Sequence, residues 1–459
     1  MTTEELLGVS ERTVKLAVRE GVDQAQASAF ILDMALTRFA NSQIHQNISS
    51  KMEGVTIKVV TEGNKVGFIR INTLDRRRIG RALRRAIEIA NVSPPNKEFK
   101  SLPSPESWTP IEGAFDEDTA VCSPEQRADI VKDVITTAHS KSKIVKAVAG
   151  SMQSGSLAYA ISNSLNVSAW ASLSLAQLRV TVISELDGSE GFGYSEQHSR
   201  LISDIDPISV ADKAADRSVK SVKPERLMHG EYEVVLSPMA VGTLAFYLGY
   251  IGFNATRWQD GESFVKYHLN ERVFDEKISM KDDARDPRTL YSIPIDGEGV
   301  PKRVVQLVDR GVVSEGSICY DSFTAGKEGK RSTGHSMPPA IEEYLRRTPL
   351  PINLIIKPGD ATMDEMVSDT KRGVFITRFH YTNPVDRAKA VLTGLTRDGT
   401  FLIERGEISK PIMNLRFTDS LLSALSDVPM VGQGLERLEY VTAPAMKCKK
   451  LRFTGVTEY

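Results

Sequence analysis

VVLSPMAVGTLAFYLGYIGFNAT, residues 234–256, contains no charged side chain and no histidine or cysteine. A bilayer core needs roughly 20 apolar residues, so a membrane-spanning helix is one interpretation of this stretch. Its β-branched start and the pair Ser237-Pro238 instead predict a buried strand followed by a helix with proline at its first position. Gly242, Gly249 and Gly252 also lower its helix propensity. We therefore expect a buried strand and a core helix here.

The length of 459 residues exceeds the roughly 250–300 at which a single hydrophobic core stops growing, so two or three domains are expected. Hydrophobic residues at 41% and charged residues at 25% are typical of soluble globular proteins. The formal net charge of −1 gives no overall attraction to nucleic acid, and we expect no nucleic-acid partner. The N-terminal sequence MTTEELLGVS has no apolar signal-peptide core. A cytoplasmic protein without membrane association is the default expectation.

Six arginines lie close together between residues 76 and 85, where a local basic patch could contact nucleic acid. Ile79, Leu83 and Ile87 share one face of a helix in this stretch. The arginines are therefore predicted to form the solvated face of that helix.

The order of helix-like and strand-like segments predicts an α+β fold. Its predicted parts are an N-terminal α+β unit (1–92), a proline-rich linker (93–118), a second, similar α+β unit (119–226) and a β-rich C-terminal domain (227–459). The predicted helices of the two units are 10–20, 74–90, 123–139 and 207–222. Their predicted strands are 27–37, 55–61 and 65–71, with several more between 144 and 197. For the C-terminal domain we predict strands at 294–299, 311–320, 351–358, 373–379, 399–408 and 446–455, and helices at 341–347 and 419–426.

Three polar motifs resemble ligand-binding loops only superficially. The glycines that follow Asp187 lie between strand-like runs, which predicts a hairpin turn and not a nucleotide loop. Residues 325–334 are basic and glycine-containing but lack phosphate-loop spacing, so a basic surface or cleft loop is expected. Residues 281–287 hold three carboxylates, and we expect an acidic turn there in preference to a hard-cation site.

The cysteines and histidines assign no chemistry on their own. Cys122, Cys319 and Cys448 are widely separated, which predicts neither a disulfide framework nor a structural zinc site. The seven histidines never occur at i, i+4 or i, i+5 spacing. The chain also has no GxSxG motif, so a hydrolase of that type has no support.

An ordered series of motifs runs through the C-terminal half. Its members are IDGEGVP at 295–301, STGH at 332–335, Asn383-Pro384 and TGLTRDGTFLIERGEI at 393–408. This series resembles the C-terminal domain of the TldD/PmbA family, a group of zinc-dependent peptidases and their partners that are also described as modulators of DNA gyrase. The N-terminal helix and the hairpin around Gly67 are similar too, so the resemblance covers nearly the whole chain.

In the metal-binding branch of that family, the helix after the corresponding strand carries HExxxH, and a cysteine near the C-terminus is a further zinc ligand. The imidazoles and the thiolate hold the ion, and the glutamate polarises its water. Matched without gaps, the motif positions fall on Phe246, Tyr247 and Ile251, which supply neither a zinc ligand nor a general base. Cys448 is expected to be a strand residue. The chain therefore resembles the metal-free TldE/PmbA branch, with no catalytic residue and no metal ligand of its own.

The resemblance implies a role in a heterodimer whose two subunits enclose a cavity for peptides or unfolded proteins. This chain would need no cofactor, zinc would be carried by a TldD-like partner, and this chain would shape the substrate groove. The family motifs suggest as cleft-lining residues Asp296, Glu298, Thr333, His335, Asn383 and Arg397. Two alternatives stay open: a stand-alone peptide-binding or regulatory homodimer, and a hydrolase with an unrecognised non-zinc site.

The ungapped match to the motif also leads to an expectation about the stability of the folded chain. If Phe246 and Ile251 fill the space that zinc ligands would need, both side chains should be buried in the core. Phe246→Ala should then cost about 3–5 kcal/mol, and Ile251→Ala about 2–5 kcal/mol.

Overall fold

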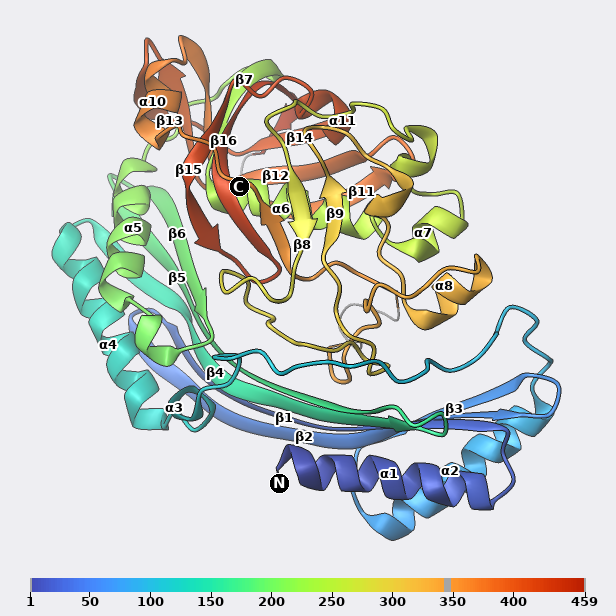
Figure 1. The fold of residues 1–459 in the computed structure, drawn as a ribbon. Coiled ribbons are helices and arrows are strands. Elements are labelled where there is room, and N and C mark those ends of the chain that lie inside the picture. Colours follow the sequence, from blue (N-terminus) through green and yellow to red (C-terminus); the bar gives the residue numbers. More distant parts are fainter. Residues whose placement is uncertain (1, 342–347, 458–459) are drawn as a thin grey trace.

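The computed structural model describes residues 2–341 and 348–457. Figure 1 shows a long curved sheet from the N-terminal half, with helices on its outer face and the C-terminal domain on its inner face. This first sheet has six strands in the order β3-β2-β1-β4-β5-β6, and the C-terminal domain is built on a sheet of ten. The predicted α+β fold is confirmed.

Two units of similar order form the N-terminal half. The first consists of α1 (Thr3–Arg19), β1 (Gln24–Ala40), β2 (Gln43–Thr61), β3 (Lys65–Ile71) and α2 (Arg76–Val92). After the short helix α3 (Glu117–Ala120), the second consists of α4 (Pro124–Lys141), β4 (Val145–Asn163), β5 (Ser168–Leu186), β6 (Ser189–Ser199) and α5 (Pro207–Lys220). The units join where β1 pairs antiparallel with β4, from Gln26 opposite Asn163 to Phe39 opposite Gly150. Residues 93–116 between the units contain no helix or strand.

Matching glycines let a helix lie close against the outer strand of each unit. A Cβ added to Gly67 in β3 would lie 2.0 Å from the carbonyl oxygen of Ala86 in α2. A Cβ added to Gly193 in β6 would lie 2.0 Å from the carbonyl oxygen of Ala214 in α5. Glycine is required at both places because any side chain would push the helix off the sheet.

The C-terminal domain combines long and short strands with short helices. Its strands are β7 (Gly230–Leu236), β8 (Met280–Asp282), β9 (Val305–Val308), β10 (Leu354–Ile356), β11 (Arg372–Asp386), β12 (Val391–Glu404), β13 (Glu407–Pro411), β14 (Leu415–Ser420), β15 (Met430–Arg437) and β16 (Val441–Val456). Its α-helices in the described residues are α6 (Pro238–Ile251), α7 (Ala255–Gln259), α8 (Ser322–Lys327), α10 (Met363–Ser368) and α11 (Leu421–Ala424).

The uncharged stretch forms the strand and helix that the sequence predicts. β7 lies between β11 and β16 in the sheet, and α6 follows it at once. Ser237 caps α6 by accepting a hydrogen bond from the Ala240 N–H, and Pro238 is the first helical residue. Ten of the helix's residues are buried, so it packs in the core on most of its surface. Within the described residues, no helix has the length and apolar character to cross a membrane.

Some predicted elements are wrong or differ in extent. Residues 294–299 and 311–320 are not strands but loops with isolated bridges, such as Ile295 with Pro301, and the second segment also contains the short 3-10 helix Glu315–Ser317. The reason is visible at Asp296, whose carboxylate accepts the Glu298 and Val300 N–H groups and so replaces a neighbouring strand. Of the helix predicted at 341–347, all but the first residue lies outside the described residues. α1 and β2 begin earlier than expected, and the helix predicted at 419–426 is only the four residues of α11.

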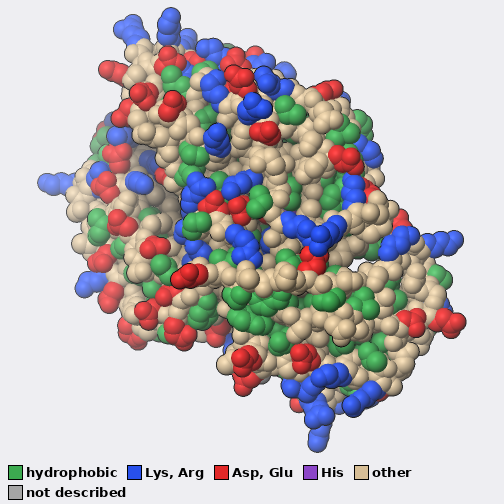
Figure 2. Space-filling model, in the orientation of Figure 1, with side chains coloured by type: hydrophobic (Ala, Val, Ile, Leu, Met, Phe, Trp, Pro, Cys, Tyr) green, Lys and Arg blue, Asp and Glu red, His purple; other side chains and the backbone are tan. Residues whose placement is uncertain are grey.

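Two surface predictions are confirmed. The six arginines of α2 are exposed, whereas Ile79 and Leu83 are buried beneath them. Asp187 and Gly188, with φ of 51° and 79°, make the tight turn of the β5–β6 hairpin. On the face shown in Figure 2, Lys and Arg side chains are interspersed with Asp and Glu, in keeping with the net charge of −1.

Candidate functional site

The three residues that the sequence match assigns to the family motif lie on α6 with different degrees of burial. Ile251 is fully buried in the C-terminal core. Phe246 and Tyr247 are half-buried and pack at the edge of that core. A helix turns about 100° per residue, so positions five residues apart point in different directions. The expectation that Phe246 is as fully packed as Ile251 is therefore wrong.

Phe246 belongs to a column of aromatic rings. It stacks on Tyr440 with ring centroids 5.3 Å apart, and Tyr440 stacks on Tyr291 with centroids 5.4 Å apart. Tyr247 packs edge-on against Phe246 at 5.6 Å. The Tyr247 hydroxyl donates a hydrogen bond to the Thr382 carbonyl oxygen in β11, and burial raises the pKa of this phenol. The surface of α6 around Phe246 and Tyr247 is thus occupied by aromatic packing.

These residues do not fit a zinc ion. Phe246 and Ile251 have no donor atom, and the Tyr247 hydroxyl is already bonded to the backbone. Cys448 lies in β16 opposite Val234 of β7, as predicted for a strand residue, and burial raises the pKa of its thiol to about 12. Among the described residues, no group of three or more His, Cys, Asp or Glu side chains could hold a metal ion.

A buried ion cluster surrounds His335. Its Nε2 lies 3.0 Å from Asp282 Oδ1, and Lys302 Nζ lies 3.8 Å from the same oxygen. Thr333 Oγ1 lies 2.9 Å from Nδ1 of the imidazole. Burial and the charge of Lys302 lower the pKa of His335, so the ring is neutral near pH 7. Burial opposes ionisation of Asp282, but Lys302 and His335 together hold its pKa below the usual value. The cluster is closed from solvent and fixes the fold around it.

Asp296 and Glu298 form a second polar group nearby. Asp296 is fully buried, and its second carboxylate oxygen accepts the Ser336 N–H at 3.0 Å. Burial and the negative charge of Glu298 raise the pKa of Asp296 to about 7. Lys58 of β2 lies 3.1 Å from Glu298 and holds the pKa of that carboxyl below its usual value against the effect of burial. Asp296 is therefore a structural carboxyl, whereas Glu298 faces the N-terminal sheet.

Glu298 lines a polar cavity of about 140 Å³ between the inner face of the N-terminal sheet and the C-terminal domain. Gln26 and Thr56 line it from the sheet, and Asp321 lines it from the start of α8. Of the predicted cleft-lining residues, Glu298 lines this cavity, and Asp296, Thr333 and His335 lie in the loops beside it.

The two other predicted cleft residues lie elsewhere. Asn383 in β11 is exposed, and its amide donates to the Tyr381 carbonyl oxygen at 3.2 Å. Arg397 in β12 is exposed and lies 3.1 Å from His380 Nδ1. Both belong to the β11–β12 ladder, where Asn383 lies opposite Thr393 and Arg397 lies opposite Arg378. The structure therefore does not bring all six predicted residues into one site.

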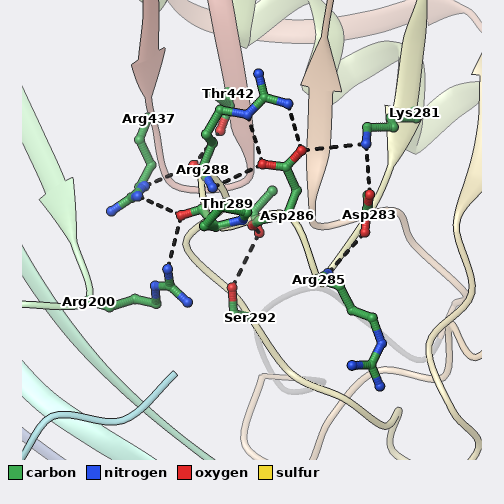
Figure 3. Close-up of polar contacts among 11 residues, drawn as sticks. Arg200, Lys281, Asp283, Arg285, Asp286, Arg288, Thr289, Ser292, Arg437 and Thr442 are labelled. Carbon is green, nitrogen blue, oxygen red and sulfur yellow. Dashed lines mark hydrogen bonds and ion pairs between the residues drawn. The ribbon is translucent and has the colours of Figure 1, made fainter. Parts of the chain in front are cut away.

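The acidic turn at 281–287 is engaged in ion pairs within the chain (Figure 3). Arg288 holds both oxygens of Asp286, at 2.8 and 2.6 Å, and this pairing lowers the pKa of Asp286 to about 2. Lys281 lies 2.7 Å from Asp283. The expected acidic turn is confirmed for Asp283 and Asp286, whose charges are matched by Lys281 and Arg288. The third carboxylate of the segment, Asp282, is instead the buried last residue of β8.

The same loop is tied to both halves of the molecule. Arg200 at the end of β6 and Arg437 in β15 both donate to the Pro287 carbonyl oxygen, at 2.9 and 2.8 Å (Figure 3). The Thr442 hydroxyl donates to the Arg288 carbonyl oxygen at 2.9 Å. These bonds fix the start of the segment that leads to Asp296 and Glu298.

Sequence reasoning missed Lys58, Gln26, Asp282 and Tyr440. Lys58 and Glu298 are 240 residues apart in the chain, so no local pattern links them. A usable signal does exist on the strands: Gln26 and Lys58 are polar residues at positions that face the C-terminal domain. An alternating strand with polar residues on the face expected to be buried points to a site.

Comparisons with known proteins agree with this architecture. The PmbA/TldA metallopeptidase C-terminal domain matches residues 229–455, the central domain matches 119–222, and domain 1 matches 34–90. A "Metalloprotease PmbA homolog" of Haemophilus influenzae is 21% identical, with 98% of each chain covered.

Two solved structures have the same fold. A protein of Thermotoga maritima described as a modulator of a DNA gyrase has a TM-score of 0.85 and 22% identity, covering 99% of this chain and 100% of its own. TldE from Thermococcus kodakarensis has a TM-score of 0.88 and 16% identity, covering 97% of this chain and 99% of its own.

The matched domains and the fold define a protein of PmbA/TldA metallopeptidase architecture. The chain belongs to the PmbA/TldD family.

Proposed function

We propose that this chain is a metal-free, non-catalytic subunit that works with a zinc-bearing TldD-like partner in the cleavage of peptides or unfolded proteins. The observation that carries the proposal is the composition of α6: Phe246 and Ile251 cannot bind zinc, and Tyr247 cannot replace a carboxylate base. The proposal includes assembly as a dimer in the cytoplasm. The similarity to TldE supports the fold that such a subunit would have.

The aromatic column gives the role a physical basis. Phe246, Tyr440 and Tyr291 join α6 to the loop that leads to the interdomain cavity. Packed rings make a rigid wall, and exposed edges of aromatic rings provide apolar contact area for an extended peptide. In this proposal the chain supplies a wall of the substrate chamber and the partner supplies the chemistry.

The test is reconstitution with a family member that carries HExxxH and is encoded by the same genome. The purified chain should contain well under one zinc and should not cleave an unstructured peptide by itself. Mixing it with the partner should give a complex with cleavage that a chelator abolishes. A partner in which the HExxxH glutamate is changed to glutamine is the matched control, and it should bind without restoring cleavage.

Three outcomes would contradict the proposal. Stoichiometric zinc and chelator-sensitive cleavage by the chain alone would show a metal site of its own. Chelator-insensitive cleavage by the chain alone would favour a hydrolase with a different site. Tight peptide binding by a homodimer that does not bind the HExxxH partner would favour a stand-alone binding protein.

A further inference from the structure

The inner face of the N-terminal sheet turns polar where it meets the C-terminal domain. Gln26 lies opposite Lys58 and Ser28 lies opposite Thr56 in the β1–β2 pairing. All four residues line the cavity of about 140 Å³. Further along the same face of β1, Phe30 is packed in an apolar cluster. A group of four polar residues on a face that is otherwise used for packing indicates a binding surface.

Two polar atoms of this wall have no hydrogen-bond partner in the part of the chain that the structure describes. They are the side-chain oxygen of Gln26, a residue only 6% exposed, and the hydroxyl of Thr56. A buried polar atom without a partner destabilises a fold by about 1–3 kcal/mol. Both atoms can accept a hydrogen bond, so a ligand with N–H donors would remove this cost.

The opposite wall carries negative charge that the lining does not balance. Among the described lining residues, Lys58 is positive, and Glu298 and Asp321 are carboxylates. Lys58 forms an ion pair with Glu298, with its Nζ 3.1 Å from Glu298 Oε1. One oxygen of Asp321 accepts the Thr324 N–H at 2.7 Å as the cap of α8, and the other has no hydrogen bond within the described residues. Burial and the charge of Glu298 raise the pKa of Asp321, against a smaller opposing effect of the charge of Lys58.

We propose that this cavity binds a primary ammonium group, presented either by the free amino terminus or by a lysine side chain of a peptide. An ammonium group has three N–H donors and one positive charge. It therefore matches the oxygens of Gln26, Thr56 and Asp321 in number and neutralises the remaining charge. The peptide as carrier rests on the proposed function, whereas recognition of the ammonium group does not.

The first experiment compares short peptides on the isolated full chain by titration calorimetry. The probes are trialanine amide with a free amino terminus, Nα-acetyl-lysine amide, and acetyl-trialanine amide as the blocked control. At least one ammonium-bearing probe should bind at least tenfold more tightly than the blocked control. The difference in affinity between the two ammonium-bearing probes shows whether the group comes from an amino terminus or from a lysine side chain. Equal binding of all three, or binding of none, would overturn the proposal. No partner subunit is present, so failure here is distinct from failure of the reconstitution.

The second experiment removes the unbalanced charge. Asparagine caps a helix about as well as aspartate, so Asp321→Asn should keep α8 while weakening the ammonium probe at least tenfold. Asp75→Asn is the matched control, because Asp75 caps α2 in the same way and is exposed outside the cavity. If Asp321→Asn and Asp75→Asn leave the affinity equally unchanged, the cavity does not recognise the charge.

Thr56→Val separates binding from folding. Removing a hydroxyl that has no partner should raise the melting temperature of the ligand-free chain, since valine has the same shape and suits a strand. The same change should lower affinity for the ammonium probe because an acceptor is lost. A rise in melting temperature with unchanged affinity would show that only water occupies the cavity and would overturn the proposal.

Discussion

The ring of Phe246 stacks on that of Tyr440 at a centroid separation of 5.3 Å and an angle of 29° between the ring planes. This contact places the residue at a family zinc-ligand position within the packing between α6 and the segment that joins β15 to β16. Tyr440 is in turn stacked on Tyr291 at an angle of 11°. Phe246 therefore has a structural contact at the place that the ungapped sequence match assigns to a zinc ligand, and the energetic consequences of that contact can be measured.

Ile251→Ala and Phe246→Ala should differ in cost. Ile251 is fully buried, so its truncation should lower the free energy of unfolding by about 2–5 kcal/mol. Phe246 is half-buried, so its truncation should cost about 1–3 kcal/mol, less than the sequence alone led us to expect. Urea denaturation of both variants measures the difference. Thr243→Ala on the same helix is the control, because within the described residues its hydroxyl bonds only to the Met239 carbonyl oxygen of α6. A larger loss for Phe246 than for Ile251 would show that the stack dominates the core contact.

Restoring the family motif should not restore a metal site. We expect the combined variant Phe246→His, Tyr247→Glu and Ile251→His to lose stability, since the imidazole at 251 would be buried among apolar side chains. Zinc should remain well below one per chain, because a third ligand is missing and the thiol of Cys448 is protonated in β16. Metal analysis after dialysis and a peptidase assay check both expectations. A folded, zinc-loaded and active variant would prove that another side chain completes the site.

Local patterns predicted the elements that caps and tight turns delimit, and they failed where a side chain takes over the hydrogen bonds of the backbone. The apolar run on both sides of Ser237-Pro238 predicted β7 and α6, and the Asp187-Gly188 turn predicted the β5–β6 hairpin. The 294–299 segment has β-like composition, yet the Asp296 side chain satisfies its backbone and prevents strand pairing.

The candidate site was less predictable still. Lys58 and Glu298 meet only because the inner face of the N-terminal sheet lies against the C-terminal domain. His335 belongs to a family-like motif, but its partner Asp282 lies in a segment whose sequence predicts an acidic turn. Such pairs carry no periodic signal, so the fold has to be known before they can be found.

Asp282→Ala should be among the most destabilising single changes in the chain. It would leave Lys302 buried without its carboxylate and remove the acceptor of the Asn353 N–H, which now bonds to Asp282 at 2.8 Å. Losing one partner of a buried pair typically costs about 3–5 kcal/mol. The double variant Asp282→Asn with Lys302→Met, which removes both charges, should be less damaging than Asp282→Ala. The midpoints of urea denaturation compare the stabilities of the two variants. A double variant less stable than Asp282→Ala would show that the ion pair itself stabilises the fold.

Asp296 should make the chain less stable as pH rises. The folded state raises the pKa of this carboxyl from 3.8 to about 7, so between these values the folded chain holds a proton that the unfolded chain has lost. The folded state therefore binds more protons, and its stability falls as pH increases from about 4 to about 7, by an amount on the order of a few kcal/mol. Asp296→Asn has no proton to lose at this position. Its unfolding free energy, compared with that of the wild type at pH 5 and pH 8, should show a smaller decline.

The amide cannot accept the Ser336 N–H as the second carboxylate oxygen does, which lowers stability at both pH values alike and does not affect the comparison. Asp75→Asn, at an exposed cap, should follow the wild type at both pH values. If wild type and Asp296→Asn decline by equal amounts, Asp296 is ionised in the fold throughout this range, and its three backbone hydrogen bonds outweigh both burial and the charge of Glu298.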